Sequence, residues 1–208
     1  MLNTDPLVRL FGGIARVKIL RFFLLNQEVV VDKSEISKRS KIPMSVLGKE
    51  LSMLTSIGFL KQANLAVEGV KGKKVKIRGW KLNSEWKLNS ALSELLFDTD
   101  LFSGDELIRR FQVIGKLKLI VTAGVFLRES GSRVDLLLVA DNLKKNVLDR
   151  VLKQLESEIG RELNYSVFSS ADFQYRVSMY DKFVRDVLDY PHNTILDKLG
   201  LEPRPYSV

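Results

Sequence analysis

The chain has 208 residues, 45% of them hydrophobic, which predicts one or two domains with enough apolar side chains to form cores. It contains no cysteine and a single histidine, so disulfides, thiolate nucleophiles, cysteine zinc sites and histidine clusters are excluded. Any catalysis would rest on carboxylates with a hard metal ion such as Mg²⁺. Without a secretory signal or an apolar run of about eighteen residues, we expect a cytoplasmic protein with no membrane partner.

The positive charge is concentrated in the first half of the chain. The net charge is +8, and residues 1–100 hold 17 Lys or Arg against 10 Asp or Glu. Residues 101–208 are nearly balanced, with 16 basic and 15 acidic side chains. This distribution predicts that the first half binds a polyanion, with a merely solvated basic surface as the alternative.

Apolar residues at helical spacing predict one long amphipathic helix near the start of the chain. They are Leu7, Leu10, Phe11, Ile14, Val17, Leu20 and Leu24. Gly12 and Gly13 lie inside this segment, and each glycine costs a helix about 1 kcal/mol relative to alanine. We expect tertiary packing to outweigh that cost and keep the helix continuous.

Residues 34–60, SEISKRSKIPMSVLGKELSMLTSIGFL, predict two helices joined by a tight turn. Ser34 is the expected N-cap of the first helix, and Pro43 suits the first turn of the second, where its missing N–H needs no partner. Gly58 is expected to end the second helix. One face of that helix is apolar and should meet the core (Leu47, Leu51 and Leu54). This order is a helix-turn-helix.

A basic hairpin is predicted directly after these helices. Residues 59–67 and 73–82 have the composition of strands, and residues 69–72, GVKG, suit the turn between them. Residues 61–81 contain seven Lys or Arg and one acid, Glu68. A hairpin with this charge next to a helix-turn-helix predicts a wing whose lysines reach phosphates.

The first half resembles the winged-helix transcriptional regulators of bacteria and archaea in FGGIARVKILRFFLLN, in LGKELSMLTSIGFL and in the hairpin. The resemblance implies that the second helix of the pair reads bases through its outward residues. Those positions are Ser45, Val46 and Lys49. It also implies phosphate contacts from neighbouring lysines (Lys41, Lys71, Lys73, Lys74 and Lys76). A winged helix that only contacts proteins is the alternative.

The polar segment 98–105 predicts a boundary between a winged-helix domain with a linker helix, residues 1–100, and a second domain, residues 101–208. In the second domain we expect strands over 118–126, 134–140 and 162–168, and helices over 106–113, 143–159, 171–175 and 179–188. The predicted fold class is a mixed α+β or α/β chain, in which flanking helices cover a small mixed sheet.

This second half resembles the minimal nucleotidyltransferase domain, as it occurs fused behind winged helices in regulators, over about residues 105–200. The likeness rests on VDLLLVAD, QLESEIG, RELNYSVFSSADFQYR and MYDKFVRDVLDYPH. Active members carry Gly-Ser after the first strand, Asp-x-Asp on the second and a third acid on the next. Alternate strand residues project to one side, so two such acids can share the metal ions that bridge nucleotide phosphates.

The matching positions of this chain lack most of those groups. Gly124 stands at the Gly-Ser position without a following hydroxyl, Arg133 replaces the first acid, and Asn164 replaces the third. Only Asp135 remains, and an Arg133–Asp135 ion pair is the expected arrangement. Glu129 or Asp141 as substitute acids is the alternative. The sequence therefore predicts a degenerate nucleotidyltransferase site without a metal or other cofactor.

The combined hypothesis is a sequence-specific regulator of transcription that binds double-stranded DNA as a homodimer. Its inactive nucleotidyltransferase-like domain would serve dimerisation or the sensing of a nucleotide or protein effector. Gly131-Ser132 is a candidate phosphate cradle, with Arg128 and Arg133 supplying charge. Two alternatives stay open: an active magnesium-dependent nucleotidyltransferase, and a toxin–antitoxin or RNA-associated adaptor.

Overall fold

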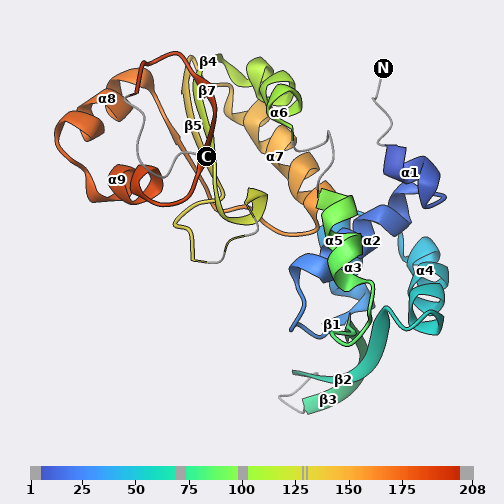
Figure 1. The fold of residues 1–208 in the computed structure, drawn as a ribbon. Coiled ribbons are helices and arrows are strands. Elements are labelled where there is room, and N and C mark those ends of the chain that lie inside the picture. The colour runs from blue at the N-terminus through green and yellow to red at the C-terminus, as the bar shows by residue number, and fades with distance from the viewer. Residues whose placement is uncertain (1–5, 69–73, 98–102, 128, 130, 202–208) are drawn as a thin grey trace. The chain divides into compact units, whose positions relative to one another are not determined.

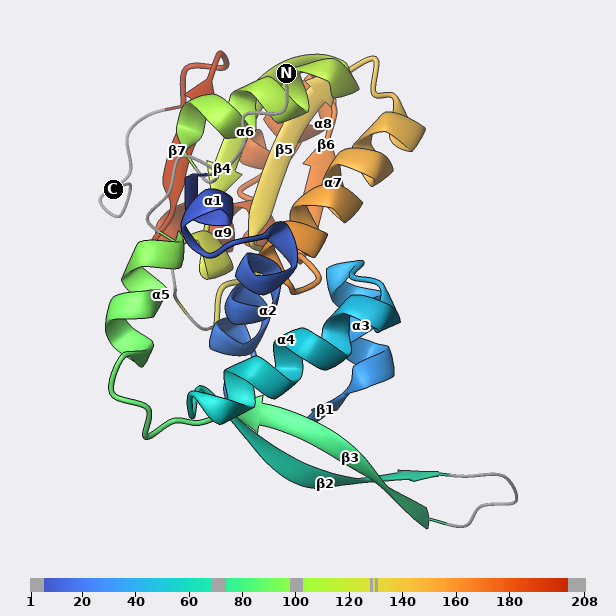
Figure 2. The same ribbon diagram turned by 90° about the vertical axis from the view of Figure 1, so that its right-hand side faces the viewer.

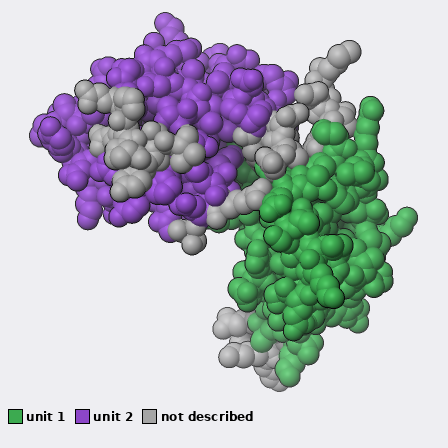
Figure 3. All heavy atoms as spheres, viewed as in Figure 1, with its two compact units in different colours: residues 1–99, 155–162 green, residues 100–154, 163–208 purple. Residues whose placement is uncertain are grey.

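The structure, a computed structural model, describes residues 6–68, 74–97, 103–127, 129 and 131–201 (Figure 1). Helices and strands are mixed along the chain, and the strands form two small sheets. This confirms the prediction of a mixed fold class. Two compact units are present, residues 1–99 with 155–162 and residues 100–154 with 163–208 (Figure 3). Within the described ranges, every helix is too short or too polar to cross a bilayer.

The first predicted helix is divided at the two glycines. Helix α1 spans Pro6–Leu10 and helix α2 spans Ile14–Leu25. Gly12 has a φ of 77°, a left-handed conformation that glycine adopts without steric cost, so the chain turns there. The prediction of one continuous helix is therefore wrong, because the backbone freedom of the glycine pair prevailed over the apolar periodicity.

The two helices of the predicted helix-turn-helix are α3, Lys33–Ser40, and α4, Met44–Ser56. Asp32 caps α3 by accepting hydrogen bonds from the backbone N–H groups of Ser34 and Glu35, so the N-cap is Asp32 and not Ser34. Pro43 is the N-cap of α4, one residue before the predicted first-turn position. Gly58 follows the end of the helix with a φ of 81°, as expected. The apolar face of α4 is buried in the core as predicted (Leu47, Leu51 and Leu54).

The sheet of this unit has the order β1-β3-β2. Strands β2, Leu60–Glu68, and β3, Lys74–Leu82, form an antiparallel hairpin that extends beyond the helices (Figure 2). The short strand β1, Val31–Asp32, pairs with β3 and was not predicted. Helix α5, Asn89–Phe97, follows the hairpin and contributes the fully buried Leu96 to the core.

The second unit is built around a four-stranded sheet with the order β6-β5-β4-β7. Its helices are α6, Gly104–Phe111, α7, Lys145–Ile159, α8, Ser170–Ser178, and α9, Lys182–Asp189. Its strands are β4, Lys116–Thr122, β5, Leu136–Asp141, β6, Tyr165–Phe168, and β7, Asn193–Asp197. The β5–β6 pair is parallel and the other pairs are antiparallel, so the sheet is mixed. Strand β7 was not predicted.

Helices cover both faces of this sheet. Figure 1 shows β4, β5 and β7 between α6 and α7 on one side and α8 and α9 on the other. The central strand β5 is buried along nearly its whole length. Odd-numbered residues of β4 and β5 pack against α8 and α9 (Leu119, Val121, Leu137 and Val139). Burial on both faces explains why these strands read as continuous apolar runs.

The end of α7, with the residues that follow it, is part of the N-terminal unit. Lys18 Nζ donates hydrogen bonds to Ser157 Oγ and to the Ser40 carbonyl, 3.2 Å away in the latter case. Burial lowers the pKa of Lys18, and the nearby Glu158 carboxylate partly opposes this shift. The hydroxyl of Ser157 also donates to the Ser40 carbonyl, so a small polar network joins α2, α3 and the end of α7.

Asp141, at the end of β5, should make the stability of the protein pH-dependent in acid. It accepts hydrogen bonds from the backbone N–H and the hydroxyl of Ser170, and these bonds, aided by Lys118 and Lys116, hold its pKa below the usual range. A depressed folded-state pKa contributes stability above the unfolded pKa, and the contribution is lost as pH falls through the folded one. The stability difference between wild type and Asp141→Asn should thus be constant near neutrality and shrink below about pH 4. Urea denaturation at several pH values measures it, and a difference independent of pH would contradict the assignment.

Candidate nucleic-acid interface and candidate ligand pocket

The predicted base-reading residues lie on the solvent side of α4. Ser45, Val46 and Lys49 are all exposed, whereas Leu47 between them is fully buried. Lys41 is exposed in the turn before α4, where it adopts a left-handed backbone conformation with a φ of 57°. The first turns of α4 therefore expose one polar, one apolar and one basic side chain to solvent.

Gly48 lies in the middle of α4 and leaves this surface flat. A Cβ added at Gly48 would meet only the Nζ atom of Lys33, at 3.3 Å, which is the end of a flexible side chain. Alanine is favoured over glycine in a helix by about 1 kcal/mol. Gly48→Ala should therefore raise the free energy of unfolding by about 0.5–1 kcal/mol, measured by urea denaturation. A loss of stability would show that α4 needs the glycine for another reason.

The hairpin carries basic residues on both faces: Lys76 and Arg78 lie on the face that meets the helices, whereas Lys61 and Lys81 lie on the opposite face. Leu60 and Leu82 are paired across the strands and are both buried in the core that includes the apolar face of α4. Side chains alternate along a strand, and directly paired residues share a face. The exposed pairs Asn64–Arg78 and Ala66–Lys76 therefore continue that face outward. Arg78 and Asn64 were not among the predicted DNA contacts, although the alternation of the strand could have identified them.

Several cations near this surface have no acidic partner. In the described part of the chain, Lys41, Lys49, Lys76 and Arg78 form no ion pair, in contrast to Lys61, whose Nζ lies 2.6 Å from Glu85 Oε2. The hydrogen bond and charge of Lys61 lower the pKa of Glu85. The predicted contacts Lys71 and Lys73, and the side chain of Lys74, lie outside the described residues. The unpaired cations give the face of α4 and the hairpin a positive charge.

Asp135 is a buried structural residue of the second unit. Its side chain is 2% exposed, and Oδ1 accepts a hydrogen bond from the Val125 backbone N–H at 2.8 Å, while Oδ2 accepts one from the Asn164 backbone N–H at 2.9 Å. The Asp135 backbone also bonds Ala123 and Asn164. This carboxylate thereby joins the 3₁₀ turn Gly124–Phe126 after β4 to the segment that enters β6.

Arg133 is not the partner of Asp135. Its guanidinium forms an ion pair with Asp186 on α9, at 2.6 Å, and its side chain is 52% exposed. The predicted Arg133–Asp135 ion pair is therefore wrong. Strand β5 begins at Leu136, so residues 133 and 135 precede the regular strand, and one side chain points outward while the other points inward. The two positions do not form the side-by-side pair that shared metal ions require.

Gly124 lies directly beside the Asp135 carboxylate. Its φ is 50°, and a Cβ added to it would collide with Asp135 Oδ1. Its backbone N–H donates to Ser132 Oγ at 3.1 Å. The Ser132 hydroxyl, from the loop before β5, thus lies beside Gly124, although Val125 and not a hydroxyl residue follows Gly124 in the sequence. Asn164 approaches only through its backbone, and its side chain is exposed.

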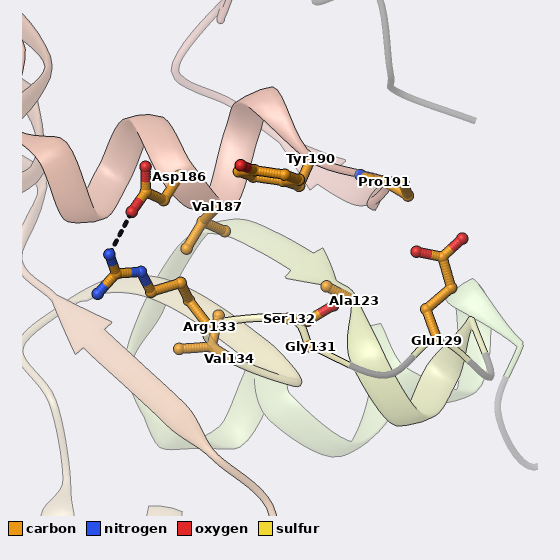
Figure 4. Close-up of a pocket in the computed structure, with 10 residues that line it drawn as sticks. All are labelled: Ala123, Glu129, Gly131, Ser132, Arg133, Val134, Asp186, Val187, Tyr190 and Pro191. Carbon is orange, nitrogen blue, oxygen red and sulfur yellow. Dashed lines mark ion pairs between the residues drawn. The ribbon is translucent and has the colours of Figure 1, made fainter.

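A pocket of about 300 Å³ opens beside this loop (Figure 4). Its lining comes from the end of β4, the loop before β5 and the end of α9 with the following turn. The Arg133–Asp186 ion pair lies at one end and the carboxyl group of Glu129 at the other, with Tyr190 and Pro191 along one wall. Gly131 and Ser132 line it too, but the described charges are two carboxylates and one guanidinium, which does not favour a phosphate.

The acids that could have replaced the missing metal ligands are not gathered with Asp135. Glu129 lies on the pocket wall, and Asp141, at the opposite end of β5 from Asp135, is bonded to Ser170. Among the described residues, no three acidic or histidine side chains are arranged to hold a metal ion. His192 is buried, and its Nδ1 bonds the Tyr190 carbonyl at 2.8 Å.

Comparison of the chain with models of known protein families, with curated proteins and with solved structures found no match.

Proposed function

We propose that this protein is a sequence-specific DNA-binding regulator of transcription, whose C-terminal unit is a non-catalytic nucleotidyltransferase-like body. The observation that carries the proposal is the positively charged surface formed by α4 and the helix-facing side of the hairpin. On it, Lys49, Lys76 and Arg78 are exposed and lack acidic partners among the described residues. Such a surface suits the regularly spaced phosphates of a duplex.

The order of elements supports a winged helix. Helix α2, strand β1, helices α3 and α4 and the hairpin β2–β3 follow one another, and the hairpin completes a sheet with β1. In this arrangement α4 enters the major groove and the hairpin reaches the flanking backbone. A single short helix contacts too few base pairs for selectivity, so we propose that two copies bind two half-sites.

The geometry around Asp135 supports a C-terminal unit that has no transferase activity. Two-metal transfer needs carboxylates that share ions, whereas both oxygens of Asp135 are held by backbone N–H groups and Arg133 is drawn to Asp186. A non-catalytic C-terminal unit is suited to dimerisation, or to binding an effector in the pocket beside the loop that precedes β5.

We expect no transfer of labelled nucleotide to protein, RNA or small acceptors with Mg²⁺ or Mn²⁺ present. Arg133→Asp should not create activity, because position 133 is exposed, whereas Asp135 is buried with both carboxylate oxygens hydrogen-bonded to backbone N–H groups. The measurement is incorporation of label from each of the four nucleoside triphosphates. Metal-dependent incorporation that Asp135→Asn abolishes would contradict the proposal and establish an active transferase.

The proposal of DNA binding is tested by selection of duplexes from a random library with the full-length chain. A sequence-specific dimer should enrich one motif, arranged as two half-sites whose centres lie about 10–10.5 base pairs, or a multiple of that, apart. Enrichment without a motif would reduce the protein to a general nucleic-acid binder. Enrichment of RNA over duplex DNA in a parallel library would favour an RNA-associated adaptor.

A further inference from the structure

Apolar side chains lie exposed on the first turns of α4. Met44 is 46% exposed and Val46 is 39% exposed, while Leu47 beside them is completely buried. Valine is also a poorer helix former than the lysine or glutamate residues that usually occupy exposed positions. Val46 therefore adds little to the stability of α4. A contact between Val46 and a binding partner would explain why an apolar side chain is exposed at this position.

The charges around Val46 indicate what that contact is. Lys49 follows one turn later on the same side of α4 and has no ion pair among the described residues. Glu50, also one turn from Val46, is held by Arg16 with 2.8 Å between Nε and Oε2, so the charge of this acid is compensated. An apolar side chain beside an uncompensated cation suits a partner that is negatively charged yet offers an apolar group.

The major groove of DNA has this combination. Its edges are lined by phosphates, thymine presents a 5-methyl group, and guanine presents the acceptors N7 and O6. We infer that Val46 packs on a thymine methyl and that Lys49 contacts a guanine close by, which deepens and rests on the proposed DNA-binding function. Three helical residues rise by about 4.5 Å and a base pair by about 3.4 Å, so the two bases lie within about two base pairs of each other.

The inference is tested on the duplex obtained by selection. Each thymine is replaced in turn by deoxyuridine, which removes only the 5-methyl group and keeps the base pair. One position in each half-site should weaken binding about fourfold, since burying one methyl group is worth about 0.8 kcal/mol. The loss should be the same at low and high salt, because no charge is removed.

The same titrations with Val46→Ala assign the effect to this side chain. The variant should bind the thymine and deoxyuridine duplexes with nearly equal affinity, whereas Val29→Ala, which alters another exposed valine of the same unit, should retain the fourfold difference. Val46→Thr is a conservative second variant. It keeps the shape of the side chain, so it checks that the effect of Val46→Ala does not come from a change in folding. Sequence-specific binding that is indifferent to every thymine methyl, or a methyl effect that Val46→Ala leaves intact, overturns the inference while DNA binding itself stands.

Discussion

Asp135→Ala is expected to lower the free energy of unfolding by about 3 kcal/mol. The substitution removes a buried carboxylate that accepts hydrogen bonds from the N–H groups of Val125 and Asn164, and hydrogen bonds to charged groups contribute about 1.5–3 kcal/mol each. Both N–H groups would then lack an acceptor inside the protein. Asp135→Asn should also destabilise, because its amide can offer only one oxygen and would turn an NH₂ group toward one of these donors.

Urea denaturation of the full chain measures this loss, with Asp149→Ala as the control. Asp149 is an exposed residue of α7, and its replacement should change stability by less than about 0.5 kcal/mol. If Asp135→Ala is as stable as the control, the carboxylate is not the structural link described above. A functional role for Asp135 would then regain support.

Replacement of Lys76 and Arg78 by alanine should weaken binding to every duplex alike. Each phosphate contact contributes about 0.9 to the slope of log affinity against log salt, so losing both should reduce the slope by about 1.8. Near 0.1 M salt this corresponds to roughly a tenfold loss of affinity for each contact. The measurement is a series of DNA titrations across salt concentrations.

The control is the double variant Lys145→Ala with Lys153→Ala. It removes the same charge from exposed positions of α7 and should leave the slope unchanged. Equal effects of the two double variants would mean that net charge alone drives binding. Lys49→Ala should act differently from both, with a loss of about 1–3 kcal/mol that is confined to sites containing the contacted guanine.

Periodicity and alternation were sufficient to predict the elements that carry the proposed DNA-binding surface. The spacing of Leu47, Leu51 and Leu54 oriented α4, so the exposed positions Ser45 and Lys49 followed from the burial of their neighbours. The hairpin followed from composition and a glycine-containing turn. Arg78 was missed because the charge of the segment was counted without assigning each residue to a strand face.

Partners that are distant in sequence could not be predicted in this way. Asp186 lies far along the chain from Arg133, and only the packing of α9 brings the two together. The acceptors and donors around Asp135 come from two segments that are distant in sequence, near Val125 and at Asn164, so its structural role has no local signature. Strand β7 pairs with β4, and its short sequence, NTILD, offered only a weak β-branched signal after Pro191.

The division of the first helix illustrates a competition between the apolar periodicity, which favours one continuous helix, and the backbone freedom of glycine, which favours a turn. Apolar residues continue at helical spacing through Gly12 and Gly13, but glycine reduces the stability of a helix and permits a left-handed turn. Without the packing of α1 and α2, the sequence did not reveal which of the two effects was larger. The same applies to the N-cap of α3, where Asp32 and Ser34 are both suitable types and only the fold places Asp32 at the helix start.

Genome-wide footprinting of the protein in the cells that produce it will show whether it occupies specific DNA sites through the surface of α4 and the hairpin. We expect a limited set of occupied sites that share the motif obtained by selection, together with loss of occupancy when Lys49, Lys76 and Arg78 are all replaced by alanine. Absence of enriched DNA sites, or occupancy that this variant retains in full, would contradict the assignment of the α4 and hairpin surface to sequence-specific DNA binding.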